Sequence, residues 1–361
     1  MKAIDELREW AGASVDRPRP LPPSAYCSED VLAREIDRLF HTGWVCVGHV
    51  SELAEVGDHF TFDLCGRSVL VARAESMGIR AHANVCPHRG CELVEGSGRS
   101  RRFACRYHSW TFDLDGALRG APHMDPDDVA GVALHEYAVE TWEGLIFVSV
   151  GPDPEPLELS ALTERVGPYG GSEYVVVHRA DAEVACNWKV LVENFCESYH
   201  LFAVHRETLE PTTPTASIQV RDGGPAFNHH TMDRVSPEYL ADPALAKIPA
   251  QWRHNSHLIC IYPSTAYSIE AQTAIWLSVV PISAGRSRYT AWVALPPRTA
   301  HDETIGAAAV AAFEEFMAED EVVIEAVQRG LASGVPLAGV LNEWERPNWE
   351  FGRHIAGRLL A

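Results

Sequence analysis

The sequence Cys86-Pro87-His88-Arg89-Gly90 is followed by Cys105-Arg106-Tyr107-His108, with sixteen residues between His88 and Cys105. Each of these two stretches carries one thiol and one imidazole in a short segment typical of a turn. Two thiolates on one iron and two imidazoles on the other are the ligands of a mixed-ligand [2Fe–2S] cluster. The two stretches therefore predict a cluster held by Cys86, His88, Cys105 and His108 on two loops of a β domain.

A structural zinc ion is the alternative occupant of these loops, because two cysteines and two histidines also suit zinc. Zinc fingers usually group Cys with Cys and His with His, whereas each loop here carries one residue of each kind. This distribution favours the iron–sulfur cluster.

The sequence around the loops predicts a small all-β domain. From Trp44 to about Val150, short runs rich in β-branched and aromatic residues alternate with Gly, Asp and Asn. A proline-rich stretch, Gly151–Pro156, indicates a boundary linker. Since 361 residues exceed one ordinary core, we expect the cluster domain at 44–152 and a second domain at 153–361, to which an N-terminal arm at 1–43 belongs.

Downstream of the linker, strand-like and helical patterns occur in separate runs, which predicts an α+β fold rather than a doubly wound sheet. Near the N-terminus, Ser28 is expected to cap a helix. The strand-like runs are Tyr174–His178, Ala182–Cys186, Leu258–Ile261, Thr273–Pro281 and Ser287–Leu295. The helical runs are Asn187 to about His205 and His301–Ser333.

The composition excludes several classes of function. A net charge of −20 and a pI near 5.2 argue against nucleic acid as a partner, because neutralising phosphates needs a basic surface. The apolar runs are far shorter than the roughly 20 residues of a membrane span. The start is acidic, without the apolar segment of a secretory signal. The nine cysteines are then expected to be reduced thiols or ligands in a cytoplasmic protein.

A second metal site is predicted around His200 and His205, with Glu197 three residues before the first of them. Histidines five apart point about 140° apart on an ideal helix, so both can bind one metal only if the helix loosens or ends between them. Two histidines and a carboxylate form the facial triad of non-haem Fe(II) oxygenases. Taken alone, the segment is equally compatible with a surface helix carrying two unrelated histidines.

Both segments together resemble the Rieske non-haem iron oxygenases, the family of ring-hydroxylating oxygenase large subunits. The cluster loops resemble their Rieske domain, and Asn187-Trp188-Lys189, Glu193-Asn194, Tyr199-His200 and His205 resemble the signature of their catalytic domain. The resemblance implies that His200 and His205 bind iron together with a distant aspartate shortly before Glu-x-x-Gln. Asp320 fits that position, with Glu319 and Glu321 as neighbouring alternatives.

By the same resemblance, Glu197 and Asn194 are catalytic positions. The acidic residue before the first histidine bridges two subunits in this family, passing an electron from a cluster histidine such as His108 to His200. Most ring dioxygenases carry aspartate at this position. The glutamate makes the chain resemble the oxygenases that act on betaine, carnitine and related quaternary amines. Tyr107 and Trp110 stand where respiratory Rieske proteins have cysteine and serine, which places the expected potential at roughly −150 mV.

The resemblance implies an oxygenase component that uses O2 and electrons from NAD(P)H to hydroxylate or demethylate a quaternary amine or an aromatic compound. The chain shows no nucleotide-binding GxGxxG after a strand, so a separate reductase or ferredoxin is expected as its partner. A head-to-tail homotrimer is implied, because the family transfers electrons between subunits. The alternatives are a cis-dihydroxylating dioxygenase and a Rieske electron carrier that is not an enzyme.

Two further features carry weaker expectations. An aromatic set lies in segments that line the substrate pocket in this family, although aromatic residues in strands are most often core; the set is Phe202, His230, Tyr262 and Trp276, with Thr273, His229 and Tyr267 in the same segments. A basic cluster, Arg99 to Arg102 with Arg106, lies beside the second cluster loop. It predicts a docking patch for an acidic redox partner, or simply solvated arginines.

Overall fold

The computed structural model describes residues 2–12 and 17–361. The chain divides into two compact units. His41–Glu155 forms one, called the β unit here, and Met1–Phe40 with Pro156–Ala361 forms the other, called the mixed unit. Residues 1 and 13–16 of the predicted arm lie outside the described residues. Within the part of the chain described, no helix is both long and apolar enough to cross a membrane.

The β unit consists of antiparallel strands, as its short alternating runs predict. Seven strands form one sheet in the order β1-β10-β9-β4-β3-β2-β5, and three short strands form a second in the order β6-β7-β8. The bounds are β1 (Val45–His49), β2 (Asp58–Leu64), β3 (Arg67–Arg73), β4 (Ile79–Ala83), β5 (Ser97–Arg99), β6 (Phe103–Ala104), β7 (Thr111–Phe112), β8 (Leu118–Gly120), β9 (Glu136–Trp142) and β10 (Leu145–Ser149), with turns η2 (Val50–Leu53) and η3 (Pro126–Val129).

The mixed unit is built on a second antiparallel sheet, in the order β11-β17-β16-β15-β14-β13-β12. Its strands are β11 (Val175–Val184), β12 (Gln219–Val220), β13 (Phe227–Asp233), β14 (Asn255–Ile261), β15 (Thr265–Ile269), β16 (Ala274–Ser283) and β17 (Arg286–Leu295). Its helices are α1 (Lys2–Ala11), α2 (Pro23–Cys27), α3 (Glu29–Glu35), α4 (Ser160–Val166), α5 (Trp188–Cys196), α6 (Leu201–Val204), α7 (Pro237–Leu240), α8 (Glu303–Ala332) and α9 (Arg346–Leu360).

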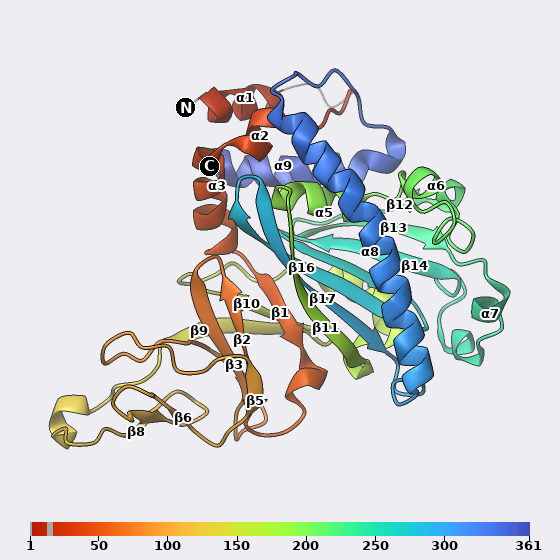
Figure 1. The fold of residues 1–361 in the computed structure, drawn as a ribbon. Coiled ribbons are helices and arrows are strands. Elements are labelled where there is room, and N and C mark those ends of the chain that lie inside the picture. Colours follow the sequence, from red (N-terminus) through yellow and green to blue (C-terminus); the bar gives the residue numbers. More distant parts are fainter. Residues whose placement is uncertain (1, 13–16) are drawn as a thin grey trace. The chain divides into compact units, whose positions relative to one another are not determined.

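One π-helical segment, η1 (Ile36–Phe40), and five short 3₁₀ helices complete the described part of the mixed unit: η4 (Gly167–Tyr169), η5 (Gly171–Glu173), η6 (Thr215–Ser217), η7 (Pro243–Lys247) and η8 (Glu343–Glu345). Helices α5 and α8 contact each other; α5 packs against the central strands and α8 against β11 and β17. The long blue helix α8 runs across the sheet in Figure 1. The α+β class expected from the sequence is thus confirmed.

Some of the helices and strands predicted from the sequence are confirmed and others are wrong. Ser28 caps α3 as predicted, since its Oγ accepts from the N–H of Val31, and α8 occupies the predicted helical run. The two strands expected between residues 174 and 186 are wrong, because β11 runs unbroken through Asp181 beside β17, with only a bulge after Val176. Strands β13 and β15 lie outside the predicted runs, because polar residues, such as the four consecutive ones from 228 to 231 in β13, interrupt their apolar pattern.

Buried charges tie the N-terminal arm to α5. The Nζ of Lys189 lies 2.6 Å from Oε1 of Glu35, and both side chains are fully buried. The indole Nε1 of Trp188 donates to the other oxygen of Glu35 at 2.8 Å. One turn along α5, the carboxylate of Glu193 accepts from the hydroxyl of Tyr26 at 2.8 and 2.9 Å. These contacts fix the helix that precedes the histidine segment.

The carboxyl of Glu193 carries a testable pH dependence. Burial raises its pKa from an ordinary 4.5 to about 7, even though Tyr26 and Lys189 lower it. When folding raises the pKa of an acid, the acid lowers the unfolding free energy. The loss grows as pH rises from the pKa of the unfolded state to that of the folded state. We expect Glu193→Gln to gain about 1–3 kcal/mol of unfolding free energy relative to the parent between pH 5 and pH 8. Urea titrations at both pH values measure this difference, and an equal offset at the two would contradict it.

Candidate metal centres

The two cluster loops of the β unit have the same backbone design. In the first loop, which lies between β4 and β5, the N–H of Gly90 donates to the carbonyl of Cys86. In the second, between β6 and β7, the N–H of Ser109 donates to the carbonyl of Cys105. Gly90 and Ser109 both have positive φ, 74° and 59°. Each loop therefore turns back on itself four residues after its cysteine.

The side chains of these loops converge. Cys86 and Cys105 are buried, and their thiols are close enough to share a hydrogen bond. The rings of His88 and His108 lie 4.8 Å apart, and His88 stacks on Trp110 at 4.5 Å. The Nδ1 of His108 is buried without a hydrogen-bond partner. A buried imidazole nitrogen without a partner is costly unless a ligand satisfies it, so the loops fit a bound cluster.

The two thiols differ in acidity. Burial raises the pKa of Cys86, whereas the pKa of Cys105 is lowered, because backbone N–H groups of Tyr107 and His108 outweigh its burial. Thiolates, not thiols, bind metals. Cys105 is thus already biased towards the ligating form.

In the mixed unit, the histidine segment is broken rather than helical, which corrects the continuous helix expected to about His205. Helix α5 ends at Cys196, and Glu197 has extended backbone angles of φ −130° and ψ 157°. His200 and His205 stand at the two ends of the single turn α6. His200 keeps helical backbone angles, whereas His205 leaves them with φ −104° and ψ 35°, so the helical turn ends between the two histidines, as their spacing requires.

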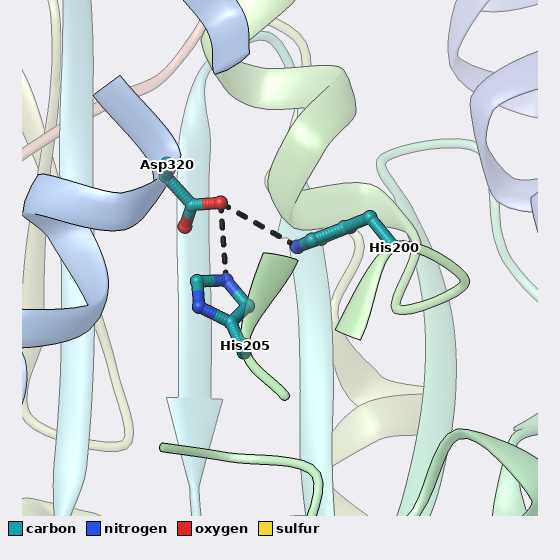
Figure 2. A group of neighbouring side chains, drawn as sticks. All are labelled: His200, His205 and Asp320. Atoms are coloured by element: carbon teal, nitrogen blue, oxygen red, sulfur yellow. Dashed lines mark hydrogen bonds and ion pairs between the residues drawn. The ribbon is translucent and has the colours of Figure 1, made fainter. Parts of the chain in front are cut away.

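This break brings both histidines to Asp320 on α8. The Nε2 atoms of His205 and His200 lie 3.1 and 3.6 Å from Oδ1 of Asp320. Figure 2 shows the three side chains pointing at one another from α6 and α8. Their ligand atoms all lie within 4.8 Å. Adjacent ligands about 2.1 Å from one ion are about 3 Å apart, so this arrangement suits a single metal with open positions.

Carboxylates fix the outer nitrogens of both rings. The Nδ1 of His200 lies 2.7 Å from Oε1 of Glu197, and the Nδ1 of His205 lies 2.7 Å from Oε2 of Glu319. Metal-binding histidines characteristically donate their second N–H to such an acceptor, which fixes the ring and its tautomer. Both Nε2 atoms are left to face Asp320. The contact between Glu197 and His200 is made across a turn, not along a helix face.

The structure separates the three neighbouring acids of α8. Asp320 is buried and faces the histidines, and its Oδ1 also accepts from Nδ2 of Asn194 at 3.1 Å. Glu319 supports His205 from outside and accepts a second bond from Thr208. Glu321 turns to β17, where it accepts from Tyr289. Of the three, Asp320 alone meets both imidazoles in the geometry of a common ion.

A cavity of about 140 Å³ opens beside these residues. One face of the sheet forms its wall, because Met232, Ser256, Leu258, Ser268 and Ile275 pair across β13 to β16 and share that face. The remaining lining comes from the helices and the strand ends: Asn194, Phe195, Glu197, Ser198, His200, Leu201, His205, Leu209, Thr213, Arg234, Glu270, Thr273, Phe316 and Asp320.

Most of the predicted pocket aromatics do not line this cavity. Trp276 follows Ile275 on β16, so it points to the opposite face, where it stacks on Trp292. Tyr262 lies beyond the end of β14 against His354, and Phe202 is half exposed on α6.

Two other predicted residues lie closer to the cavity. His230 is on its face of the sheet but behind Ser198, 2.7 Å from that hydroxyl. Burial lowers the pKa of His230 to about 3, so its ring is neutral. Thr273, from the same predicted set, does line the cavity.

Three residues escaped the sequence-based prediction of the site. From the sequence, Glu319 was only an alternative metal ligand, whereas in the structure its carboxylate contacts the Nδ1 of His205. Arg234 and Glu270 line the cavity as an ion pair with 2.7 Å between Nε and Oε2. Their signal in the sequence is weak: each immediately follows a strand of mixed polarity, which is also a common place for a solvated charge.

Comparison with known proteins identifies both domains of the chain. Residues 43–143 match the Rieske [2Fe–2S] domain, and residues 172–361 match the catalytic domain of the ring hydroxylating alpha subunit. The second match alone covers more than half of the chain.

Among curated relatives, the carnitine monooxygenase oxygenase subunit of Acinetobacter baumannii is 34% identical over 213 residues, 57% of each chain. The glycine betaine monooxygenase oxygenase subunit of Pseudomonas aeruginosa is 32% identical over 221 residues, 58% of this chain and 52% of the relative. The chain thus spans just over half the length of the curated relatives it matches.

Solved structures share the fold over nearly the whole chain. The quaternary ammonium Rieske monooxygenase CntA superposes with a TM-score of 0.83 at 24% identity, covering 98% of both chains. Naphthalene 1,2-dioxygenase from Rhodococcus sp. gives 0.80 at 19% identity, covering 99% of this chain and 98% of that one. The chain belongs to the ring-hydroxylating alpha-subunit family, with a Rieske [2Fe–2S] domain followed by the family's catalytic domain, which binds a mononuclear iron.

Proposed function

We propose that this protein is the oxygenase component of a multi-component Rieske system that hydroxylates or oxidatively demethylates a small quaternary amine. The observation that carries the proposal is the convergence of His200, His205 and Asp320 at a cavity, in a chain that also holds the cluster loops. The curated relatives named for carnitine and glycine betaine support the substrate class. A Rieske electron carrier needs no second iron site and no cavity beside it.

Each residue of the site has a separate task in this proposal. His200, His205 and Asp320 hold the iron, which supplies O2 activation when bound. Glu197 and Glu319 each hold the Nδ1 of one imidazole, which leaves its Nε2 facing the metal position and fixes the orientation of the ring. Asn194 orients the carboxylate of Asp320 through its 3.1 Å hydrogen bond. The apolar lining, which includes Phe195, Leu201 and Phe316, excludes water from the oxidised carbon.

The proposal includes a partner and an assembly. Electrons come from NAD(P)H through a separate reductase or ferredoxin, and the chain works as a head-to-tail homotrimer in which Glu197 receives an electron from His108 of a neighbouring subunit. A closed ring of three heterologous interfaces satisfies that arrangement. A cytoplasmic location goes with the nine cysteines, none of which forms a disulfide in the structure.

The test combines metal analysis with oxygen uptake. Three irons per chain and the EPR signal of a reduced Rieske cluster are expected, with O2 consumption coupled to oxidation of a betaine in a panel that also contains aryl methyl ethers and aromatic acids. Two irons per chain would indicate the electron carrier, and zinc without iron a structural site. Cis-diol formation from an aromatic acid, without amine oxidation, would establish the dihydroxylating alternative.

The basic cluster predicts where the reductase docks. Arg99 is held in an ion pair with Asp58, but Arg101, Arg102 and Arg106 are exposed and form no ion pair with another described residue. Rim charges of this kind mainly set association rates. We expect the double variant Arg101→Glu/Arg102→Glu to raise the KM for reductase about tenfold or more, with unchanged cluster absorbance. Steady-state turnover at increasing reductase concentration measures the effect.

A charge-matched control separates docking from net charge. Arg34→Glu/Lys247→Glu reverses two exposed cations of the mixed unit, with the same change in total charge. The control should leave the KM for reductase near the parental value. Unchanged turnover in the Arg101/Arg102 variant, or an equal loss in both variants, would rule out this patch.

A further inference from the structure

The cavity contains one charged pair away from the three metal-facing residues. Arg234 directly follows β13, and Glu270 directly follows β15. Both strands are antiparallel to β14, which lies between them, so the two residues lie at the same end of these three strands. Ser256, near the start of β14, contacts Glu270 there, and all three residues line the cavity.

The carboxylate of this pair has a full set of partners. Glu270 is 8% exposed in its side chain. Its Oε2 accepts from the hydroxyl of Ser256 at 3.2 Å and its Oε1 from that of Thr273 at 3.0 Å. The Nε of Arg234 adds charge compensation at 2.7 Å from Oε2. A carboxylate held in this way is fixed in position and has little capacity left for a substrate.

The guanidinium, in contrast, is incompletely satisfied. Its Nε is close to Glu270 but lacks hydrogen-bond geometry and counts as a buried donor without a hydrogen bond. Nη1 donates to Thr213 at 3.0 Å, and the group lies over the ring of Tyr239 at 5.4 Å. Nη2 donates to no other described residue. Arginine has five N–H donors in a planar fork, so several remain for a ligand.

A buried ion pair is weak evidence for stability, because desolvating both charges offsets their attraction. Retention of an ion pair in a cavity wall is better explained when one partner has hydrogen-bond donors left over for a ligand, as Arg234 has at the lining of this cavity. A planar guanidinium with free N–H groups matches a carboxylate, which accepts two parallel hydrogen bonds. The aromatic residues of the lining are Phe195 and Phe316, neither of which can recognise an anion.

We infer that Arg234 binds the carboxylate of the substrate and that Glu270 is a positioning residue that fixes the guanidinium. The substrates are then zwitterions or organic acids that carry a carboxylate, in preference to alcohols such as choline. This inference rests on the proposed function for the identity of the site as a substrate site, and narrows its substrate class. The compound would lie between the metal-facing residues and Arg234.

Four small ligands of nearly the same shape test the inference by binding alone. Glycine betaine carries a cation and a carboxylate, choline a cation only, 3,3-dimethylbutyrate a carboxylate only, and 3,3-dimethyl-1-butanol neither charge. Calorimetric titration of the metal-loaded full chain under anaerobic conditions gives each Kd. We expect both carboxylates to bind about 10- to 100-fold more tightly than their alcohol counterparts, which is what one or two charge-assisted hydrogen bonds supply.

Variants assign this preference to Arg234. Arg234→Met should abolish it, and Arg234→Lys should retain part of it, because lysine keeps the charge without the fork. Arg234→Met/Glu270→Gln removes both charges and avoids leaving an unpaired buried carboxylate, so it tests the same point if the single variant fails to fold. Arg298→Met is the matched control, since Arg298 pairs with Asp242 outside the cavity lining, and it should keep the parental preference.

The outcomes separate this inference from the proposed function. A parental protein that binds choline as tightly as glycine betaine overturns the inference, as does a carboxylate preference that survives in the double variant. Carboxylate binding that depends on Arg234, without turnover of any amine, would sustain the inference and refute amine oxidation. Turnover of choline that does not depend on Arg234 would sustain amine oxidation and refute the inference.

Discussion

Replacing Asp320 with alanine is expected to remove the mononuclear iron and to lower turnover by at least about a thousandfold, while the Rieske cluster stays in place. Asp320 supplies the one carboxylate that meets both Nε2 atoms, at 3.1 and 3.6 Å. Without it, two imidazoles alone must hold the ion, and they do not make the facial triad. The iron count should fall from three to two per chain, with the visible absorbance of the cluster unchanged.

The two neighbouring acids serve as graded controls. Glu319→Gln should cost about 10- to 100-fold in iron affinity or activity, because Glu319 orients His205 without facing the metal position. Glu321→Gln should have no effect on iron, because that carboxylate is turned towards Tyr289. Iron dissociation constants from chelator competition rank the three variants. Loss of iron in Glu321→Gln with retention in Asp320→Ala would show that the ligand assignment on α8 is wrong.

This ranking illustrates what sequence can and cannot supply at the site. Cys86, His88, Cys105 and His108 lie in two short local motifs, so the residues themselves define the loops. Asp320 lies 115 positions from His205 on a regular helix. Adjacent helical positions differ by about 100° in direction, so Glu319, Asp320 and Glu321 are separated only once the packing of α8 against α5 is known.

The strand residues that line the cavity could not be predicted from the sequence for a different reason. Side chains alternate between the faces of a strand, so a shift of one residue exchanges the lining with the opposite face. The aromatic character of Trp276 suggested a pocket, yet its neighbour Ile275 lines the cavity. Which alternate residues of each strand face the helices depends on the pairing of neighbouring strands, for example Ser268 opposite Ile275. Composition alone does not set that pairing.

The same limit applies to the buried charges that support α5. Glu35 and Lys189 are charged residues in helical stretches, where solvated positions are the ordinary expectation. Their partnership spans 154 positions of sequence, and it depends on the N-terminal arm packing beside α5. The fold class could therefore be predicted from local patterns, whereas the interactions that place the metal-binding segment could not.

Breaking this pair is the perturbation of stability with the largest expected effect. Lys189→Met should lower the unfolding free energy by about 3–5 kcal/mol, because it leaves the fully buried carboxylate of Glu35 without its counter-charge. The variant also loses the ammonium that lies 5.5 and 5.1 Å from the rings of Tyr26 and Trp188. Urea denaturation of the iron-loaded chain, followed by tryptophan fluorescence, measures the loss.

The double variant Glu35→Gln/Lys189→Met distinguishes charge from packing. Glutamine keeps an acceptor for the indole of Trp188, which donates to Glu35 at 2.8 Å, and no charge remains buried. Replacing both members of a buried pair by neutral groups is often nearly neutral, so most of the lost stability should return. If the double variant is as unstable as Lys189→Met, the lysine acts through its packing against the aromatic rings, and the ion pair itself contributes little.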